Sequence, residues 1–303
     1  MSKLVFLNLQ DKSIQSACFC IRKEKGPMKI QKVINNNIVS SVDDNGIEVV
    51  VMGRGLGYSA KEGMEVPRNK VEKIFRLDNE DMMDRFKTLI FKLPPEQIQI
   101  SAEIIHYANE LLNKPLNQNI YLTLTDHVNF AIERFQENLF YATPLLREVK
   151  SFYREEYMVG EYGIALIEER LGIKLPVDEA ASMALHVVNA EYNAPMLDTM
   201  HITQLIQQVV KIVEECFFIR LDERSLNYER FITHLKFLAQ KIYSRESLDP
   251  EESEFTTMIS RMYPEQYACG RKIQNFIGEE YGYQIAEEEV TYLAVHIKRI
   301  CLS

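Results

Sequence analysis

Four of the six histidines recur at matched positions in two similar stretches of the sequence. These four are His127, His186, His234 and His296. The first histidines of the two stretches, in LTDHVNFAIERF and FITHLKFLAQKIY, lie 107 residues apart, and the second ones lie 110 apart. A neutral imidazole is a nucleophile toward a phosphorylated donor, and phosphorylation makes it strongly anionic. The repeat marks two pairs of histidines as functional candidates, with His106 and His201 outside them, and reversible phosphorylation is one chemistry open to them.

Other chemistries fit these histidines less well. A single histidine on an amphipathic helix is usually satisfied by a local hydrogen bond, but retention of four across a duplication favours a function. Neither pair has HExxH spacing, and the five cysteines lack the spacing of a zinc site. The sequence also contains no GxSxG elbow, no P-loop and no GxGxxG leading from a strand into a helix. We therefore expect no metal, no cofactor and no enzymatic activity.

Acidic residues beside the histidines have two interpretations. Asp126 and Glu191 are placed to orient an imidazole, whereas Asp178 and Glu179 suit the start of a helix, where carboxylates favour the dipole. We favour structural roles for all four.

A second group of polar residues lies near the N-terminus. The run Asn35–Asn37, followed by Gly53–Gly55 and Tyr58, offers amides, a guanidinium and an aromatic ring, which are groups that read structured RNA. The alternative is a strand-rich oligomerisation domain in which these are turn residues. The residues alone leave both readings open.

The surrounding pattern predicts an α+β chain. Residues 28–76 alternate as short strands, with Asp44-Asn45-Gly46 in a hairpin turn, so we expect a small antiparallel sheet that buries little surface and completes its core as a homodimer. After Leu77 the apolar residues recur at helical spacing, which predicts two homologous all-α bundles. Ala194-Pro195 indicates a linker between the bundles, with a boundary close to Asp198.

Charge and composition limit the class of protein. The formal net charge is -9, yet residues 28–76 carry 8 Lys or Arg against 6 Asp or Glu, while residues 77–303 carry 22 against 36. A mildly basic head on an acidic body is compatible with a nucleic-acid-binding module. No apolar run approaches the roughly 20 residues that cross a bilayer, and the unpatterned cysteines fit a reducing cytoplasm.

From Met28 to the C-terminus the sequence resembles the BglG/LicT family of transcription antiterminators. KVINNNIV, EVVVMGRGLGY and VEKIF resemble its co-antiterminator RNA-binding domain. LTDHVNFAI, ALHVVNAE, FITHLKFLAQ and LAVHIKR resemble its two regulation domains, which the sugar phosphotransferase system phosphorylates. The resemblance implies residues 28–83, 84–197 and 198–303 as these three domains, after an N-terminal extension of residues 1–27.

The resemblance also implies partners and sites. A dimeric β-domain is expected to grip an RNA hairpin in the leader of a sugar-utilisation transcript, nearest to β-glucoside operons, and to prevent a terminator from forming. The RNA-contacting positions that it implies are Lys32, Asn37, Gly53, Arg54 and Tyr58, the last in place of a frequent Phe. The four repeated histidines match its phosphoacceptors, with a sugar-specific enzyme II permease modifying the first domain and the phosphocarrier HPr modifying the second.

Three expectations remain to be weighed. Family members usually begin at the position of Met28, so we expect translation to start there. A DNA-binding activator with the same regulation domains is the alternative function, but it requires a helix-turn-helix, and the first 76 residues have the pattern of strands. A histidine kinase or phosphotransfer carrier is disfavoured because the sequence shows no nucleotide site.

Overall fold

The computed structural model describes residues 28–43, 46–76, 80–139, 142–192, 196–244 and 254–301. The expected N-terminal extension, the turn residues Asp44 and Asn45, and the expected linker at Ala194-Pro195 lie outside these ranges. The chain divides into two compact units, and the boundary along the sequence lies between Glu133 and Arg134. The two units are described separately.

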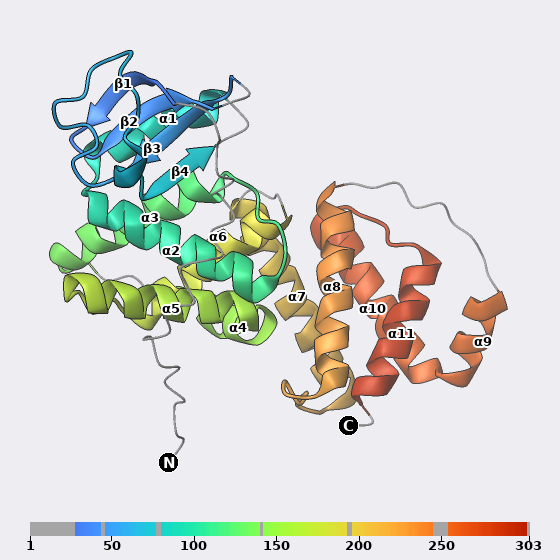
Figure 1. The fold of residues 1–303 in the computed structure, drawn as a ribbon. Coiled ribbons are helices and arrows are strands. Elements are labelled where there is room, and N and C mark those ends of the chain that lie inside the picture. Colours follow the sequence, from blue (N-terminus) through green and yellow to red (C-terminus); the bar gives the residue numbers. More distant parts are fainter. Residues whose placement is uncertain are drawn as a thin grey trace. The chain divides into compact units, whose positions relative to one another are not determined.

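The first unit begins with the predicted antiparallel sheet (Figure 1). Its strands, in spatial order, are β1 (Ile30–Asn35), β2 (Ile38–Val42), β3 (Glu48–Met52) and β4 (Lys73–Arg76). Gly46, with φ of +81°, lies in the β2–β3 hairpin, where the Gly46 amide donates to the Asp43 carbonyl at 3.0 Å. The strands and their order confirm the β part of the predicted fold class.

Both faces of this sheet are apolar. Successive side chains of a strand point to opposite faces, so Val50 packs with Phe75 on one side, and Val49 and Val51 pack on the other. Helix α1 (Glu80–Lys92) covers the first face through residues such as Phe86. The loop of residues 53–72 covers the second through Leu56 and Val66. The chain itself thus covers both faces of the sheet, so the sheet does not need a second copy to complete its core.

Helices α2 (Pro95–Leu112) and α3 (Ile120–Gln136) follow α1. Pro95 occupies the first turn of α2, where its missing N–H has no helical acceptor to lose, and Asn113 ends the helix in the left-handed region with φ of +48°. The expected boundary between residues 83 and 84 falls inside α1, whose Phe86 and Ile90 still pack under the sheet.

The second unit, which starts within the last turn of α3, is otherwise helical. Its further helices are α4 (Leu146–Phe152), α5 (Arg154–Leu171), α6 (Val177–Tyr192), α7 (Met196–Phe217), α8 (Leu226–Ser244), α9 (Glu254–Met262), α10 (Pro264–Tyr281) and α11 (Glu287–Ile300). One apolar core runs from α4 to α11 and includes Val149, Leu205, Phe231 and Leu293. The expected boundary at Asp198 falls in the first turn of α7.

The predicted duplication is visible in the backbone of these helices. Helix α5 follows Tyr153 with φ of -128° and ψ of 58°, and α10 follows Tyr263 with -130° and 61°. Both helices end at a glycine in the left-handed region, Gly172 and Gly282. The corresponding residues lie 110 positions apart, as the second histidines do.

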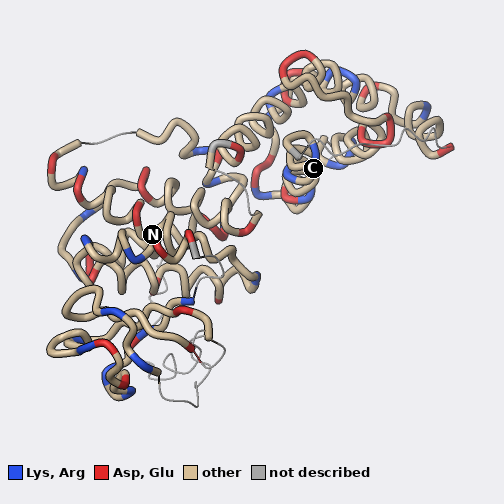
Figure 2. The backbone as a smooth tube through the Cα atoms, turned by 90° about the horizontal axis from the view of Figure 1, so that it is seen from above, with Lys and Arg blue, Asp and Glu red and all other residues tan. Residues whose placement is uncertain are grey.

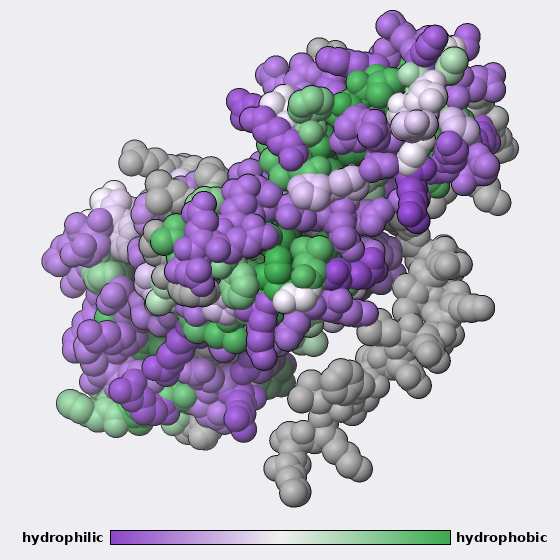
Figure 3. All heavy atoms as spheres, turned by 90° about the vertical axis from the view of Figure 1, so that its left-hand side faces the viewer, coloured by the Kyte–Doolittle hydropathy of each residue, from purple (hydrophilic) through white to green (hydrophobic). Residues whose placement is uncertain are grey.

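Charged and apolar residues are distributed over the surface of both units (Figure 2, Figure 3). Acidic and basic positions are interspersed along the helices of each unit (Figure 2). The surface seen in Figure 3 is largely hydrophilic, with apolar residues in separate small areas. Within the described ranges, no helix is both long and apolar enough to cross a bilayer.

Candidate functional site

The β1–β2 turn and the residues after β3 form one braced loop. The Gly53 amide donates to the Asn37 carbonyl at 2.9 Å, and the Gly55 amide donates to Asn37 Oδ1 at 2.8 Å. Asn37 in turn donates its own amide to Asn35 Oδ1 at 2.9 Å. Asn37 therefore holds the glycine-rich segment in place through both its backbone and its side chain.

Two positions of this segment require glycine, because the backbone of another segment lies too close for a side chain. A Cβ atom added to Gly53 would lie 1.7 Å from the Lys70 carbonyl oxygen, and one added to Gly57 would lie 2.0 Å from that of Asn35. No side chain fits at either distance. Gly53, predicted as an RNA contact, is buried and serves at least to shape the loop.

Three of the five predicted RNA-contacting residues present their side chains to solvent. Lys32 on β1 and Arg54 in the loop are exposed, and Tyr58 is 73% exposed. Asn37 is half-buried. An exposed aromatic ring close in sequence to an exposed guanidinium fits base stacking and phosphate or base-edge contact. The sequence analysis missed Lys70, whose Nζ donates to the Gly55 carbonyl at 3.4 Å and adds a positive charge to this loop.

In the second unit the histidines of the second repeat lie together. His234 on α8 and His296 on α11 stack with ring centroids 4.8 Å apart and planes 16° apart. The pairing predicted from sequence spacing is thus present in this repeat. His127 lies on α3 in the first unit and His186 on α6 in the second, and both are half-buried.

The environment of the second pair favours neutral imidazoles. Burial lowers the pKa of His234, although the Glu289 carboxylate opposes this. Burial, helped by the neighbouring His234 ring, lowers the pKa of His296 to about 4. An unprotonated ring keeps the lone pair that nucleophilic attack on phosphorus needs.

A buried ion pair accompanies the histidine helices in both repeats. Arg134 Nη2 lies 2.6 Å from Glu179 Oε1, and Lys241 Nζ lies 2.6 Å from Glu289 Oε1. The sequence analysis assigned Glu179 only to a helix start, and that assignment is incomplete, because its side chain is 8% exposed and paired. The matched spacing in the sequence could also have revealed this role, because Glu179 and Glu289 each precede the second histidine of their repeat by seven residues.

The other acidic residues near the histidines in the sequence differ in their contacts and burial. Asp178 Oδ1 accepts the Thr143 amide at 2.7 Å, a structural role as expected. Asp126 is exposed. Glu191 lies near Glu156 and, after burial, helps to raise the pKa of Glu156 to about 7.

The two histidines outside the repeat have local partners. His106 Nε2 lies 3.3 Å from Glu110 Oε1 one helical turn away. The His201 ring stacks on Tyr243 with centroids 6.0 Å apart. Neither belongs to a histidine pair.

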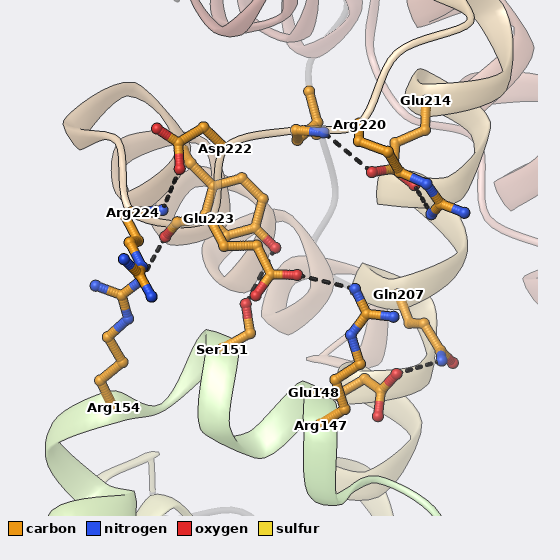
Figure 4. A network of polar contacts seen from close by, with 12 residues as sticks. Arg147, Glu148, Ser151, Arg154, Gln207, Glu214, Arg220, Asp222, Glu223 and Arg224 are labelled. Atoms are coloured by element: carbon orange, nitrogen blue, oxygen red, sulfur yellow. Dashed lines mark hydrogen bonds and ion pairs between the residues drawn. The ribbon is translucent and has the colours of Figure 1, made fainter. Parts of the chain in front are cut away.

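A polar network joins α4 and α5 to the α7–α8 region (Figure 4). Arg147 bonds Glu223 at 3.1 Å, Gln207 donates to Glu148 at 2.5 Å, and Ser151 and the Tyr228 hydroxyl lie 3.3 Å apart. These residues line a cleft of about 580 Å³ whose charges are of both signs. The described part of the chain contains no cluster of three or more metal-ligating side chains.

Comparison with known proteins identifies the domains. A model of the CAT RNA binding domain matches residues 28–84, and a model of the PRD domain matches residues 102–190 and 207–300. The chain is 42% identical over 273 residues to the transcription antiterminator LicT of Bacillus subtilis (strain 168), covering 90% of this chain and 99% of that protein. The chain belongs to the BglG/LicT family of transcription antiterminators. These proteins are regulators, not enzymes.

Two further proteins match this chain over different lengths. A beta-glucoside operon antiterminator of Dickeya chrysanthemi is 37% identical, with 90% of this chain and 96% of that protein aligned. A crystal structure of GlcT CAT-PRDI is 33% identical, covers 55% of this chain and 99% of that one, and has a TM-score of 0.49.

The domain matches place the candidate residues. The CAT match contains the whole sheet and the braced loop. The first PRD match contains His127 and His186, and the second contains His234 and His296. His201 lies between the two PRD matches.

Proposed function

We propose that this protein binds a hairpin in a leader mRNA and thereby prevents a transcription terminator from forming. The observation that carries this is the CAT RNA binding domain match, whose braced loop exposes Arg54 and Tyr58. Lys32 adds a second exposed cation, while Asn37 and Gly53 shape the loop. The active form is a cytoplasmic homodimer, in keeping with the family.

The two PRD domains regulate this activity through phosphorylation of their histidines. The stacked, neutral pair in the second PRD supports the phosphoacceptor role, because both rings keep a lone pair at neutral pH. In this proposal a sugar-specific enzyme II permease inactivates the protein at His127 and His186. HPr activates it at His234 and His296.

The regulated operon concerns sugar use, and a β-glucoside operon is the proposed target. The name of the Dickeya chrysanthemi relative supports this choice. No residue of this chain is proposed to contact the sugar, because the permease senses it.

A gel shift at fixed salt tests the RNA-binding proposal. The full chain is mixed with a leader hairpin that overlaps a terminator, with the same hairpin carrying a scrambled internal loop, and with duplex DNA. Selective binding of the native hairpin is expected. Preferential binding of the duplex DNA would favour a DNA-binding activator instead.

Phosphopeptide mapping under conditions that preserve acid-labile phosphohistidine tests the regulatory proposal. Phosphorylated HPr should label His234 and His296, and the permease domain should label His127 and His186. The matched controls are His106→Ala and His201→Ala, which should leave labelling unchanged. Loss of labelling in either control would contradict the assignment of the acceptors.

A further inference from the structure

A cation and a glutamate are paired at the same place in both PRD repeats. The cations, Arg134 and Lys241, each follow the first histidine of their repeat by seven residues, and the glutamates, Glu179 and Glu289, each precede the second by seven. Seven residues are about two helical turns, so each charged residue shares a helix face with its histidine. Both ion pairs measure 2.6 Å.

These pairs lie where charge is costly. The Glu179 and Glu289 side chains are only 8% and 9% exposed, whereas their partners Arg134 and Lys241 are 16% and 38% exposed. Removing a glutamate's charge from water often costs as much as its attraction to the cation returns, so such a pair is weak evidence of a stabilising role. The cation is Arg in one repeat and Lys in the other, which differ in shape and hydrogen-bonding geometry but not in charge. The shared feature is therefore a largely buried glutamate that is paired with a cation.

In the second repeat this glutamate faces an acceptor histidine. Glu289 binds Lys241 through Oε1, and its Oε2 lies 3.7 Å from His234 Nε2. His234 Nε2 is buried and has no hydrogen-bond partner. The other ring nitrogen, Nδ1, is thus the one to meet a donor, with Nε2 directed at the carboxylate.

We propose that Glu289, held by Lys241, is a positioning residue for phosphoryl acceptance by His234 Nδ1. The inference rests on the proposed phosphoacceptor function. It adds to that function the group that orients the His234 ring, Glu289, and the ring nitrogen that reacts, Nδ1.

The transfer step explains why a carboxylate is needed. The Nδ1 lone pair attacks the phosphorus of a phosphohistidine on the carrier protein, the new N–P bond forms, and the electron pair of the broken N–P bond returns to the carrier's ring nitrogen. The acceptor ring then carries phosphoryl on Nδ1 and a proton on Nε2, and is positively charged. Glu289 stabilises that charge beside Nε2, as a carboxylate does for the imidazolium of a catalytic triad.

Burial keeps the His234 ring neutral before transfer. Burial is the main cause that lowers the pKa of His234, the Glu289 carboxylate opposes it, and Lys241 lowers the pKa further. The pair therefore keeps a carboxylate next to Nε2 while the ring stays neutral.

The test compares charge-removing variants of the full chain. Glu289→Gln should slow labelling of His234 by phosphorylated HPr at least tenfold, and Glu289→Asp should restore part of the rate. The matched control is Glu288→Gln, which removes the same charge at an exposed neighbouring position and should have no effect. ¹⁵N NMR should show the His234 pKa moving down in Glu289→Gln and up in Lys241→Gln, with phosphorus on Nδ1.

A double variant separates positioning from folding. Lys241→Met with Glu289→Met removes both charges, so no lone buried charge remains to unfold the domain. We expect this variant to keep its thermal transition and still accept phosphoryl slowly. A wild-type rate in the double variant or in Glu289→Gln, or phosphorus on Nε2, would overturn the positioning role. Absence of His234 labelling in the unmodified chain would instead overturn the proposed phosphoacceptor function.

Discussion

At the scale of single residues, the exposed guanidinium of Arg54 is expected to make the main base or phosphate contact of the braced loop. Arg54→Ala should weaken hairpin binding by roughly 1 to 3 kcal/mol if the side chain reads a base edge through two hydrogen bonds. Lys61→Ala is the matched control, because it removes one exposed positive charge from the same loop. Gel shifts at two salt concentrations measure both. Equal losses for the two variants would reduce Arg54 to a general electrostatic contribution.

A second prediction at this scale concerns His296. Its pKa is lowered to about 4 in the fold and is about 6.5 in an unfolded chain, so the unfolded state takes up a proton first as the pH falls. His296 therefore removes stability between pH 6.5 and pH 4, on the order of 1 to 2 kcal/mol after solvent screening. His296→Asn should show a smaller drop in Tm from pH 7 to pH 5 than the unmodified chain.

The change in Tm with pH must be compared between variants, because the titration of Glu156 changes the stability in the opposite direction to that of His296. Its pKa is raised to about 7, so its protonation stabilises the fold as the pH falls toward 4.5. A pH dependence that is the same in His296→Asn and in the unmodified chain would contradict the assignment.

At the scale of elements, the packing of α5 on α6 depends on a glycine. A Cβ at Gly160 would lie 2.0 Å from the Ala180 carbonyl oxygen, whereas at Gly270, the same place in the second repeat, the nearest atoms would be Val290 Cγ1 and the Val290 carbonyl oxygen, both at 3.1 Å. Gly160→Ala must push two helix backbones apart, at a cost of about 1 to 3 kcal/mol or more. Gly270→Ala should cost clearly less, because neighbours at 3.1 Å need to move much less than a carbonyl at 2.0 Å. Calorimetry of the two variants measures the difference, and equal losses would be inconsistent with this packing.

At the scale of the whole molecule, charge mimicry should act in opposite directions in the two PRD domains. His127→Asp or His186→Asp should reduce antitermination, and His234→Asp or His296→Asp should raise it, following the regulation proposed from the family. If equivalent histidines face one another in the dimer, two negative charges about 6 Å apart repel by about 3 kcal/mol at an effective dielectric near 20. About 5.5 kcal/mol converts a 1:99 equilibrium to 99:1.

A terminator-reporter assay in cells without HPr phosphorylation measures these variants, with His201→Asp as the control. Partial effects are expected, because aspartate carries less charge than a phosphoryl group. The same direction of change in both domains would refute the dual switch.

The element types, the duplication and the matched histidine positions follow from the order of the amino acids alone. Strand alternation and helical periodicity are local patterns, and the 107- and 110-residue offsets are visible without any fold. The stacking of His234 on His296 follows once two matched helices face one another. The resemblance to known motifs supplied the RNA-contacting positions, which stay predictions.

The surroundings of these residues depend on how distant segments pack in the fold. The Arg134–Glu179 and Lys241–Glu289 pairs join residues 45 and 48 positions apart, and no local pattern distinguishes such a glutamate from one that begins a helix. The cover over both sheet faces by α1 and the 53–72 loop was likewise not predictable from alternation. The physical reason is the same in each case: burial and pairing are set by which distant segments meet, whereas periodicity records only which face of its own element a residue occupies.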